Sequence, residues 1–91
     1  MSKDRVHSKG KLTDHIILVS KYRKKILTGA VKYRLKILIR KICNQEKLSI
    51  LAMECDVDHI HILIEYPENL SISYIVQKLK QETTYYIRLI I

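Results

Sequence analysis

The segment His59–Tyr66 (HIHILIEY) constrains the fold of this chain more than any other part of its sequence. Its isoleucines stand at every second position, and this two-residue period is typical of a β-strand with one buried face. Pro67 follows directly and ends the strand, because proline has no N–H to donate to a sheet. The isoleucine face is predicted to pack on the core, so two histidines, His59 and His61, are left side by side on the open face.

Four further segments have the length and periodicity of strands or helices. Residues 14–20 and 49–55 are apolar runs of strand length, and the second is close enough to the histidine strand to pair with it as a hairpin. Thr28 and Ser71 are suitable helix caps, and apolar residues recur at helical spacing after each, up to about Glu46 in the first helix. This order predicts an α+β, ferredoxin-like or RRM-like split βαβ fold, an antiparallel sheet with two helices on one face.

A single domain is predicted, because 91 residues form one modest core. Within it, residues 1–12 are expected to be a loose basic arm and residues 13–91 an incomplete βαββα unit. The fourth strand of the fold is expected to be missing, since Tyr85–Ile91 has no capping residue and no polar finish. We interpret the chain as an interrupted domain, or as one that another chain completes.

The net charge of +8 is concentrated in one half of the chain. Residues 1–47 contain 14 Lys and Arg against three Asp and Glu, whereas residues 48–91 contain three against six. This asymmetry indicates a surface that contacts a polyanion, although a solvated lysine-rich helix face is equally compatible with it. No apolar run is long enough to span a membrane and no signal peptide is visible, so a cytoplasmic protein with reduced cysteines is expected.

The His-x-His pattern is by itself a weak signal of metal binding. Two imidazoles on one strand face reach a single divalent ion, but the ion needs at least one further ligand. The alternative is a small structural or interaction domain in which half-exposed strand histidines have no special role. Spacing alone leaves both interpretations open.

Three stretches carry a more specific signal. They are residues 15–25 (HIILVSKYRKK), residues 58–67 (DHIHILIEYP) and residues 70–80 (LSISYIVQKLK). In this order and spacing they resemble the single-tyrosine HUH transposases of small insertion sequences, the IS200-like TnpA group, where U is a hydrophobic residue. The resemblance spans nearly the whole chain, and its most specific part is the HIH motif with its flanking aspartate and Glu-Tyr-Pro.

The resemblance implies DNA transposition by a homodimer that binds single-stranded DNA with hairpin ends. It implies that His59 and His61, with a glutamine, hold a divalent ion, Mg²⁺ or Mn²⁺, which polarises the scissile phosphate. Strands are then cut and joined through a phosphotyrosine intermediate. It also favours DNA binding over a solvated loop for the basic cluster after the first strand, in which an aromatic ring can stack on a base. This cluster is Lys21, Tyr22, Arg23, Lys24 and Lys25.

The catalytic tyrosine of the resembled family precedes its glutamine by four residues on a late helix, and this chain has no such pair. None of its six tyrosines is followed by glutamine at that distance. Tyr85 and Tyr86 are the remaining candidates for the nucleophile, but core packing or a frayed helix end is the expected role for them. The nucleophile helix is therefore expected to be missing, and the chain to be truncated and inactive alone. The alternative function is that of a non-catalytic fragment that binds single-stranded nucleic acid or dimerises.

Overall fold

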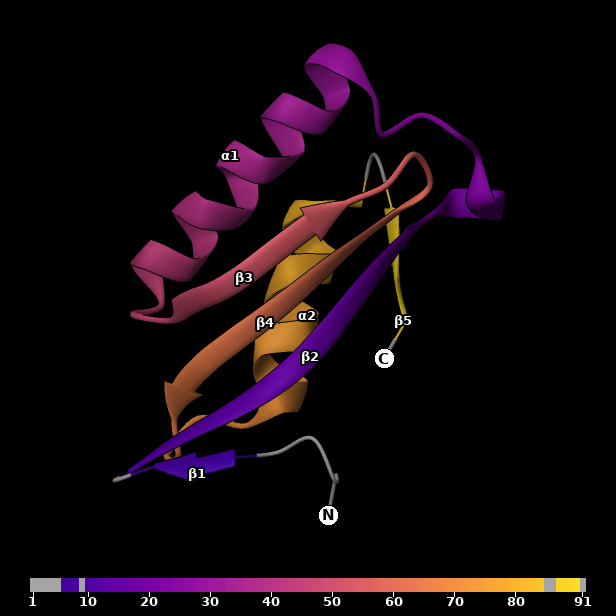
Figure 1. The fold of residues 1–91 in the computed structure, drawn as a ribbon. Helices are drawn as coiled ribbons and strands as arrows, with labels where there is room; N and C mark the ends of the chain where they lie inside the picture. Colours follow the sequence, from indigo (N-terminus) through magenta and orange to yellow (C-terminus); the bar gives the residue numbers. More distant parts are fainter. Residues whose placement is uncertain (1–5, 9, 85–86, 91) are drawn as a thin grey trace.

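The computed structural model describes residues 6–8, 10–84 and 87–90, and Figure 1 shows how they fold. These residues form five strands and two α-helices, with a short 3-10 turn, Lys21–Arg23, after the second strand. The strands are β1 (Val6–Ser8), β2 (Lys11–Ser20), β3 (Ser49–Cys55), β4 (His59–Pro67) and β5 (Ile87–Ile90), and the helices are α1 (Gly29–Gln45) and α2 (Ile72–Glu82).

The strands form one antiparallel sheet around β2 and β4. β2 pairs with β4 over almost its full length, and β3 pairs with the other edge of β4. β1 and β5 both pair with the remaining edge of β2, β1 near its start and β5 near its end (Figure 1). The predicted α+β, ferredoxin-like class is confirmed, including the hairpin of β3 and β4.

The prediction that the last strand is missing is wrong. β5 pairs with β2 in the register Ile17↔Ile90 to Ser20↔Ile87 and supplies the sixth element of a βαββαβ unit, so the unit is not an incomplete βαββα. The sequence interpretation treats the apolar end of the chain as an interruption because it has no capping residue. A strand needs no cap, and the free edge of β2 satisfies its backbone groups.

The basic arm predicted for residues 1–12 is also partly wrong. Val6–Ser8 pairs with the start of β2, and β2 begins at Lys11 instead of Asp14. The two strands are joined through Gly10, whose φ of +76° is readily adopted by glycine in a tight turn. The remaining residues of that segment, 1–5 and 9, lie outside the described ones.

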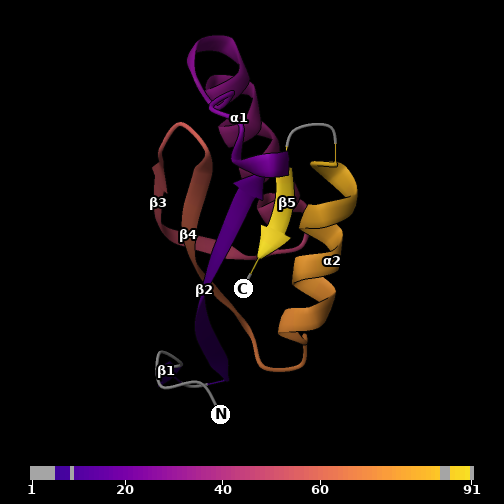
Figure 2. The same cartoon turned by 90° about the vertical axis from the view of Figure 1, so that its right-hand side faces the viewer.

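Both helices contribute to one core against the isoleucine face of β4. Leu35, Ile39 and Ile42 of α1 and Ile75 and Leu79 of α2 are buried in the same cluster as the alternating residues of β2 and β4. Figure 2 shows α2 next to β5 at the side of the sheet. The predicted core face is therefore confirmed. The helices do not cover the opposite face of the sheet. In the part of the chain that the structure describes, no helix has the length and apolar character needed to cross a membrane.

The two cysteines are both free, but their surroundings differ. Cys43 lies in the core with 1% of its surface exposed, and burial raises the pKa of its thiol to about 11. Cys55 lies at the end of β3 and is half-buried. Burial raises the pKa of its thiol, and the positive charges of Lys32 and Lys36 on α1 oppose this effect. Cys43 therefore acts as a small apolar core residue.

We expect a thiol reagent at neutral to mildly alkaline pH to modify Cys55 much faster than Cys43, because only the exposed thiolate reacts. With a pKa of about 11, roughly one Cys43 thiol in a thousand is ionised at about pH 8. A disulfide reagent that forms a mixed disulfide with the cysteine and releases a chromogenic thiol measures both rates on the native protein. Cys55→Ala should remove the faster phase, and its removal by Cys43→Ala would contradict the assignment.

Candidate metal and nucleic-acid site

The central strand β4 presents its two histidines on the face of the sheet that the helices do not cover. Burial alternates along β4, with residues 60, 62, 64 and 66 buried and the residues between them partly exposed. The buried set packs in the core, so His59 and His61 share the open face. The placement predicted for the pair from the two-residue period is confirmed.

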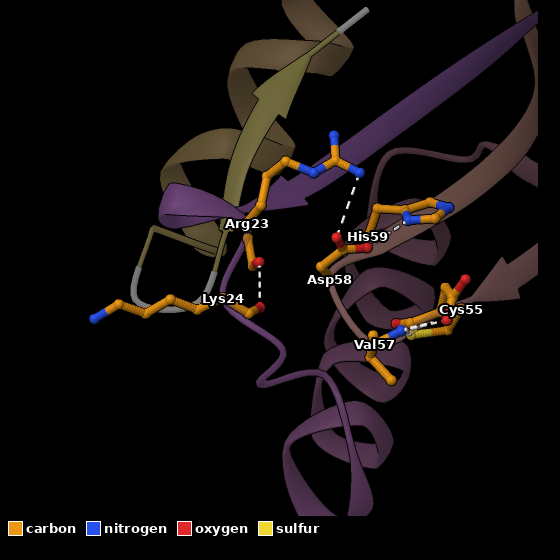
Figure 3. A network of polar contacts seen from close by, with 8 residues as sticks. Arg23, Lys24, Cys55, Val57, Asp58 and His59 are labelled. Carbon is orange, nitrogen blue, oxygen red and sulfur yellow. Dashed lines mark hydrogen bonds and ion pairs between the residues drawn. The ribbon is translucent and has the colours of Figure 1, made fainter.

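His59 is held by a chain of polar contacts (Figure 3). Its Nδ1 lies 2.8 Å from Oδ1 of Asp58, and Nη2 of Arg23 lies 3.3 Å from Oδ2 of the same carboxylate. The hydrogen bond from His59 and then the charge of Arg23 hold the pKa of Asp58 below its usual range, although partial desolvation opposes them. An ionised carboxylate only accepts hydrogen bonds, so Nδ1 of His59 carries a proton, and in the neutral ring Nε2 keeps a lone pair. This carboxylate–histidine arrangement is the one that orients metal-binding imidazoles.

His61 contacts a histidine that the sequence interpretation did not assign to the site. Nε2 of His61 lies 3.0 Å from Nδ1 of His15, and the ring centroids are 5.0 Å apart with the planes inclined by 47°. His15 is exposed on β2 between the buried residues Asp14 and Ile16, so it lies on the same open face. The alternating pattern of β2 in the sequence predicts the face on which His15 lies. It does not predict the contact with His61, which depends on the register of β2 on β4.

A pocket of about 250 Å³ lies over this part of the sheet and is lined by His15, Ala52, Glu54, His61 and Leu63. Glu54 is the β3 residue opposite His61 in the register, so a carboxylate stands beside the imidazole pair. Within residues 6–8, 10–84 and 87–90, however, no three His, Cys, Asp or Glu side chains stand in position to hold one metal ion. The site therefore consists of a pair of imidazoles with a carboxylate beside them, and not of a complete set of metal ligands.

The basic cluster, residues 21–25, lies at the end of β2 and is exposed throughout. The salt bridge of Arg23 with Asp58 brings it next to His59, and the backbone N–H of Ser20 donates to the carbonyl oxygen of Asp58 at 2.8 Å. Tyr22 is 76% exposed, and Nζ of Lys21 lies 5.3 Å from the centroid of its ring. The structure therefore places the predicted DNA-binding residues beside one predicted metal ligand.

The backbone of this cluster is strained. Tyr22 and Arg23 have φ angles of 60° and 54°, in the left-handed region that residues other than glycine seldom adopt. Such conformations persist only where surrounding contacts enforce them, and they concentrate at functional sites. Here the ion pair of Arg23 and the hydrogen bond from the Ser20 hydroxyl to the carbonyl oxygen of Lys24, at 2.5 Å, hold the turn.

Two described tyrosines are engaged elsewhere. Tyr66 is buried on the core face of β4, where its hydroxyl donates to Oδ2 of Asp14 at 2.5 Å. The hydroxyl of Tyr74, on α2, donates to Oε1 of Glu46 at 2.9 Å. Tyr85 and Tyr86, the candidates for a nucleophile, lie outside the described residues.

Comparison with known proteins gives consistent matches. Residues 8–90 match the family described as "Transposase IS200 like". The chain is 32% identical over 82 residues to the transposase for insertion sequence element IS200 of Salmonella typhimurium, which covers 90% of this chain and 54% of that protein. It is 36% identical over 66 residues to the ISDra2 transposase TnpA of Deinococcus radiodurans, covering 72% of this chain and 47% of that protein.

Two solved structures share the fold. A protein from Deinococcus radiodurans R1 described as a transposase superposes with a TM-score of 0.79 at 32% identity, over 93% of this chain and 65% of that one. A REP-associated tyrosine transposase bound to a REP hairpin superposes with a TM-score of 0.66 at 22% identity, over 99% of this chain and 60% of that one. The chain spans about half the length of the curated relatives that it matches.

Proposed function

This chain belongs to the IS200-like transposase family, and we propose that it serves DNA transposition as the metal-binding and DNA-contacting part of such an enzyme. One observation carries the proposal: the basic cluster lies beside His59, one of the two predicted metal ligands, and the contact of Arg23 with Asp58 joins them. A transposase of this kind acts on DNA, so a face that combines imidazoles with fixed positive charge suits a phosphate substrate.

We propose a divalent ion, Mg²⁺ or Mn²⁺, at His59 and His61. The donor chemistry fits, because Asp58 accepts the Nδ1 proton of His59 and leaves its Nε2 lone pair for coordination. A bound ion there supplies a positive charge that polarises the scissile phosphate. The protein orients the imidazole of His59 through Asp58 and Arg23, and it leaves the open face of the sheet accessible to the substrate.

Single-stranded DNA with a hairpin end is the substrate that we propose. The basic cluster offers exposed charges for the backbone phosphates, and the ring of Tyr22 offers a surface for a base to stack on. A protein of the same fold is described as bound to a REP hairpin, which supports this class of substrate. A homodimer and a phosphotyrosine intermediate complete the proposal, with Tyr85 and Tyr86 as the candidates for the nucleophile within this chain.

Binding of a labelled hairpin oligonucleotide with a single-stranded flank tests the DNA contact. We expect the affinity to fall steeply between about 50 and about 200 mM salt, because each neutralised phosphate of a single strand contributes about 0.7 to the slope of log K against log salt. The double variant Lys24→Ala, Lys25→Ala should bind more weakly and lower that slope by about 1.4, about 0.7 for each lost contact. Arg23 is left unchanged because it contacts Asp58.

The matched control removes two lysines from α2, in the variant Lys78→Ala, Lys80→Ala. An equal loss in this control, or binding that does not respond to salt, would contradict the proposed DNA surface. The same mixtures with Mn²⁺, analysed on a denaturing gel, separate two functions. A covalent protein–DNA adduct supports strand transfer, whereas binding without an adduct supports the non-catalytic fragment as the alternative.

A further inference from the structure

The outward face of α1 carries a concentration of positive charge that the proposed function leaves unused. The 17 residues of α1 include no carboxylate and five cations, which are Lys32, Arg34, Lys36, Arg40 and Lys41. We propose that this face binds the duplex stem of the DNA hairpin, with α1 lying along the major groove. This inference rests on the proposed function, because it assigns a second surface to the same DNA.

The positive charges of α1 are not compensated within the described part of the protein. Lys32, Lys36 and Arg40 follow one another at intervals of four residues, a spacing at which like charges on a helix repel each other. No carboxylate among residues 6–8, 10–84 and 87–90 forms an ion pair with a cation of α1. A polyanion bound to this face neutralises the repelling charges and releases its own counterions.

The cations of α1 form two rows along the helix. With 3.6 residues per turn, one row contains Lys36 and Arg40, and the other contains Arg34 and Lys41. An α-helix with its side chains is about 10 to 12 Å across, and the major groove of DNA is about 12 Å wide with a row of phosphates on each side. Two rows of cations therefore suit a duplex, whereas a single strand offers only one row of phosphates.

Two exposed residues lie between the rows of cations. Tyr33 is 67% exposed and Ile37 is 46% exposed, and their spacing of four residues makes them neighbours on the helix surface. Leu35 and Ile39 pack in the core, so α1 contacts the rest of the protein through a different face. Apolar side chains in the major groove contact thymine methyl groups. Tyr33 and Ile37 therefore face the bases, and the cations face the phosphates on either side.

The N-terminal end of α1 is joined to the basic cluster by a short loop (Figure 1). The backbone N–H of Leu27 in this loop donates to the carbonyl oxygen of Val57 at 2.8 Å, and Val57 precedes Asp58 in the connection between β3 and β4. A single-stranded flank that leaves a stem bound on α1 therefore passes residues 21–25 on its way to His59. The two basic surfaces form one path from duplex to single strand.

Binding of two labelled oligonucleotides tests the proposal, namely the hairpin with its single-stranded flank and the flank alone. The variant Arg40→Ala, Lys41→Ala removes one exposed cation from each row. We expect it to bind the hairpin at least about ten-fold more weakly at about 100 mM salt and to lower the slope of log K against log salt by about 1.8, about 0.9 for each lost contact with a duplex phosphate. Its affinity for the flank alone should be unchanged.

Tyr33→Glu places a negative charge between the two rows, and it should also weaken hairpin binding without weakening binding of the flank. The matched control is the α2 variant Lys78→Ala, Lys80→Ala, which should bind the hairpin as the unaltered chain does. Thermal unfolding shows whether each variant is folded.

Hairpin affinity that is unchanged in Arg40→Ala, Lys41→Ala, or that falls no more than the affinity for the flank, would overturn this inference and leave the proposed function intact. An equal loss of hairpin binding in the α2 control would also overturn it. The variant Lys24→Ala, Lys25→Ala distinguishes the two proposals, because it should weaken binding of both oligonucleotides. Full binding by that variant would contradict the proposed contact at the basic cluster and not this inference, whereas no binding by the unaltered chain would remove both.

Discussion

Replacement of both His59 and His61 by alanine is expected to abolish the stabilisation of this protein by Mn²⁺. An ion that binds only the folded state stabilises it by about 2.7 kcal/mol at a concentration one hundred times its Kd. For a domain of this size, this corresponds to a rise in unfolding temperature on the order of 10 °C. Thermal unfolding with and without saturating Mn²⁺ measures the effect, and the double variant should show no rise.

The control for this prediction is Leu63→Ala, a change on the same face of β4 that removes no nitrogen ligand. Its unfolding temperature without metal should be lower than that of the unaltered chain, but the rise with Mn²⁺ should remain. A rise that survives in the histidine double variant would place the ion elsewhere and contradict the site. Both histidines are partly exposed, so the double variant is expected to be folded in the absence of metal.

The sequence predicts the part of the site that depends on a single strand, namely His59 and His61 of β4. The alternation of β4 alone determines that His59 and His61 share a face, because a strand side chain has only two directions available. The helix signals were similarly local. Ser71 caps α2 by accepting a hydrogen bond from the backbone N–H of Tyr74 at 3.1 Å. Thr28 stands at the N-cap of α1, as predicted, but its side chain makes no capping hydrogen bond.

The rest of the site depends on pairings between distant segments. The contact of His15 with His61 requires the register of β2 on β4, which no local pattern specifies. The contact of Arg23 with Asp58 requires two left-handed residues in the turn after β2, a conformation that propensities disfavour. The last strand was missed for the same reason, since its partner edge on β2 exists only once the sheet has formed.

The open face keeps its geometry only while the other face is packed. Two neighbouring residues of β2 allow the contribution of each face to stability to be measured. Ile16 is fully buried opposite Ile62, whereas Ile17 is 37% exposed opposite His61. We expect Ile16→Ala to lower the free energy of unfolding by about 2 to 5 kcal/mol, because it removes buried methyl groups and leaves a cavity. Ile17→Ala makes the same chemical change on the open face, and it should cost about 1 kcal/mol or less.

Urea unfolding measures both variants, and a lower midpoint with an unchanged slope is the signature of lost stability in the folded state. Small domains are stable by only about 5 to 15 kcal/mol, so Ile16→Ala removes a large share of the total. Because the histidine face exists only in the folded sheet, metal binding by Ile16→Ala should disappear at urea concentrations where Ile17→Ala still binds. Equal midpoints for the two variants would contradict the assignment of the helix-covered face as the core that supports the site.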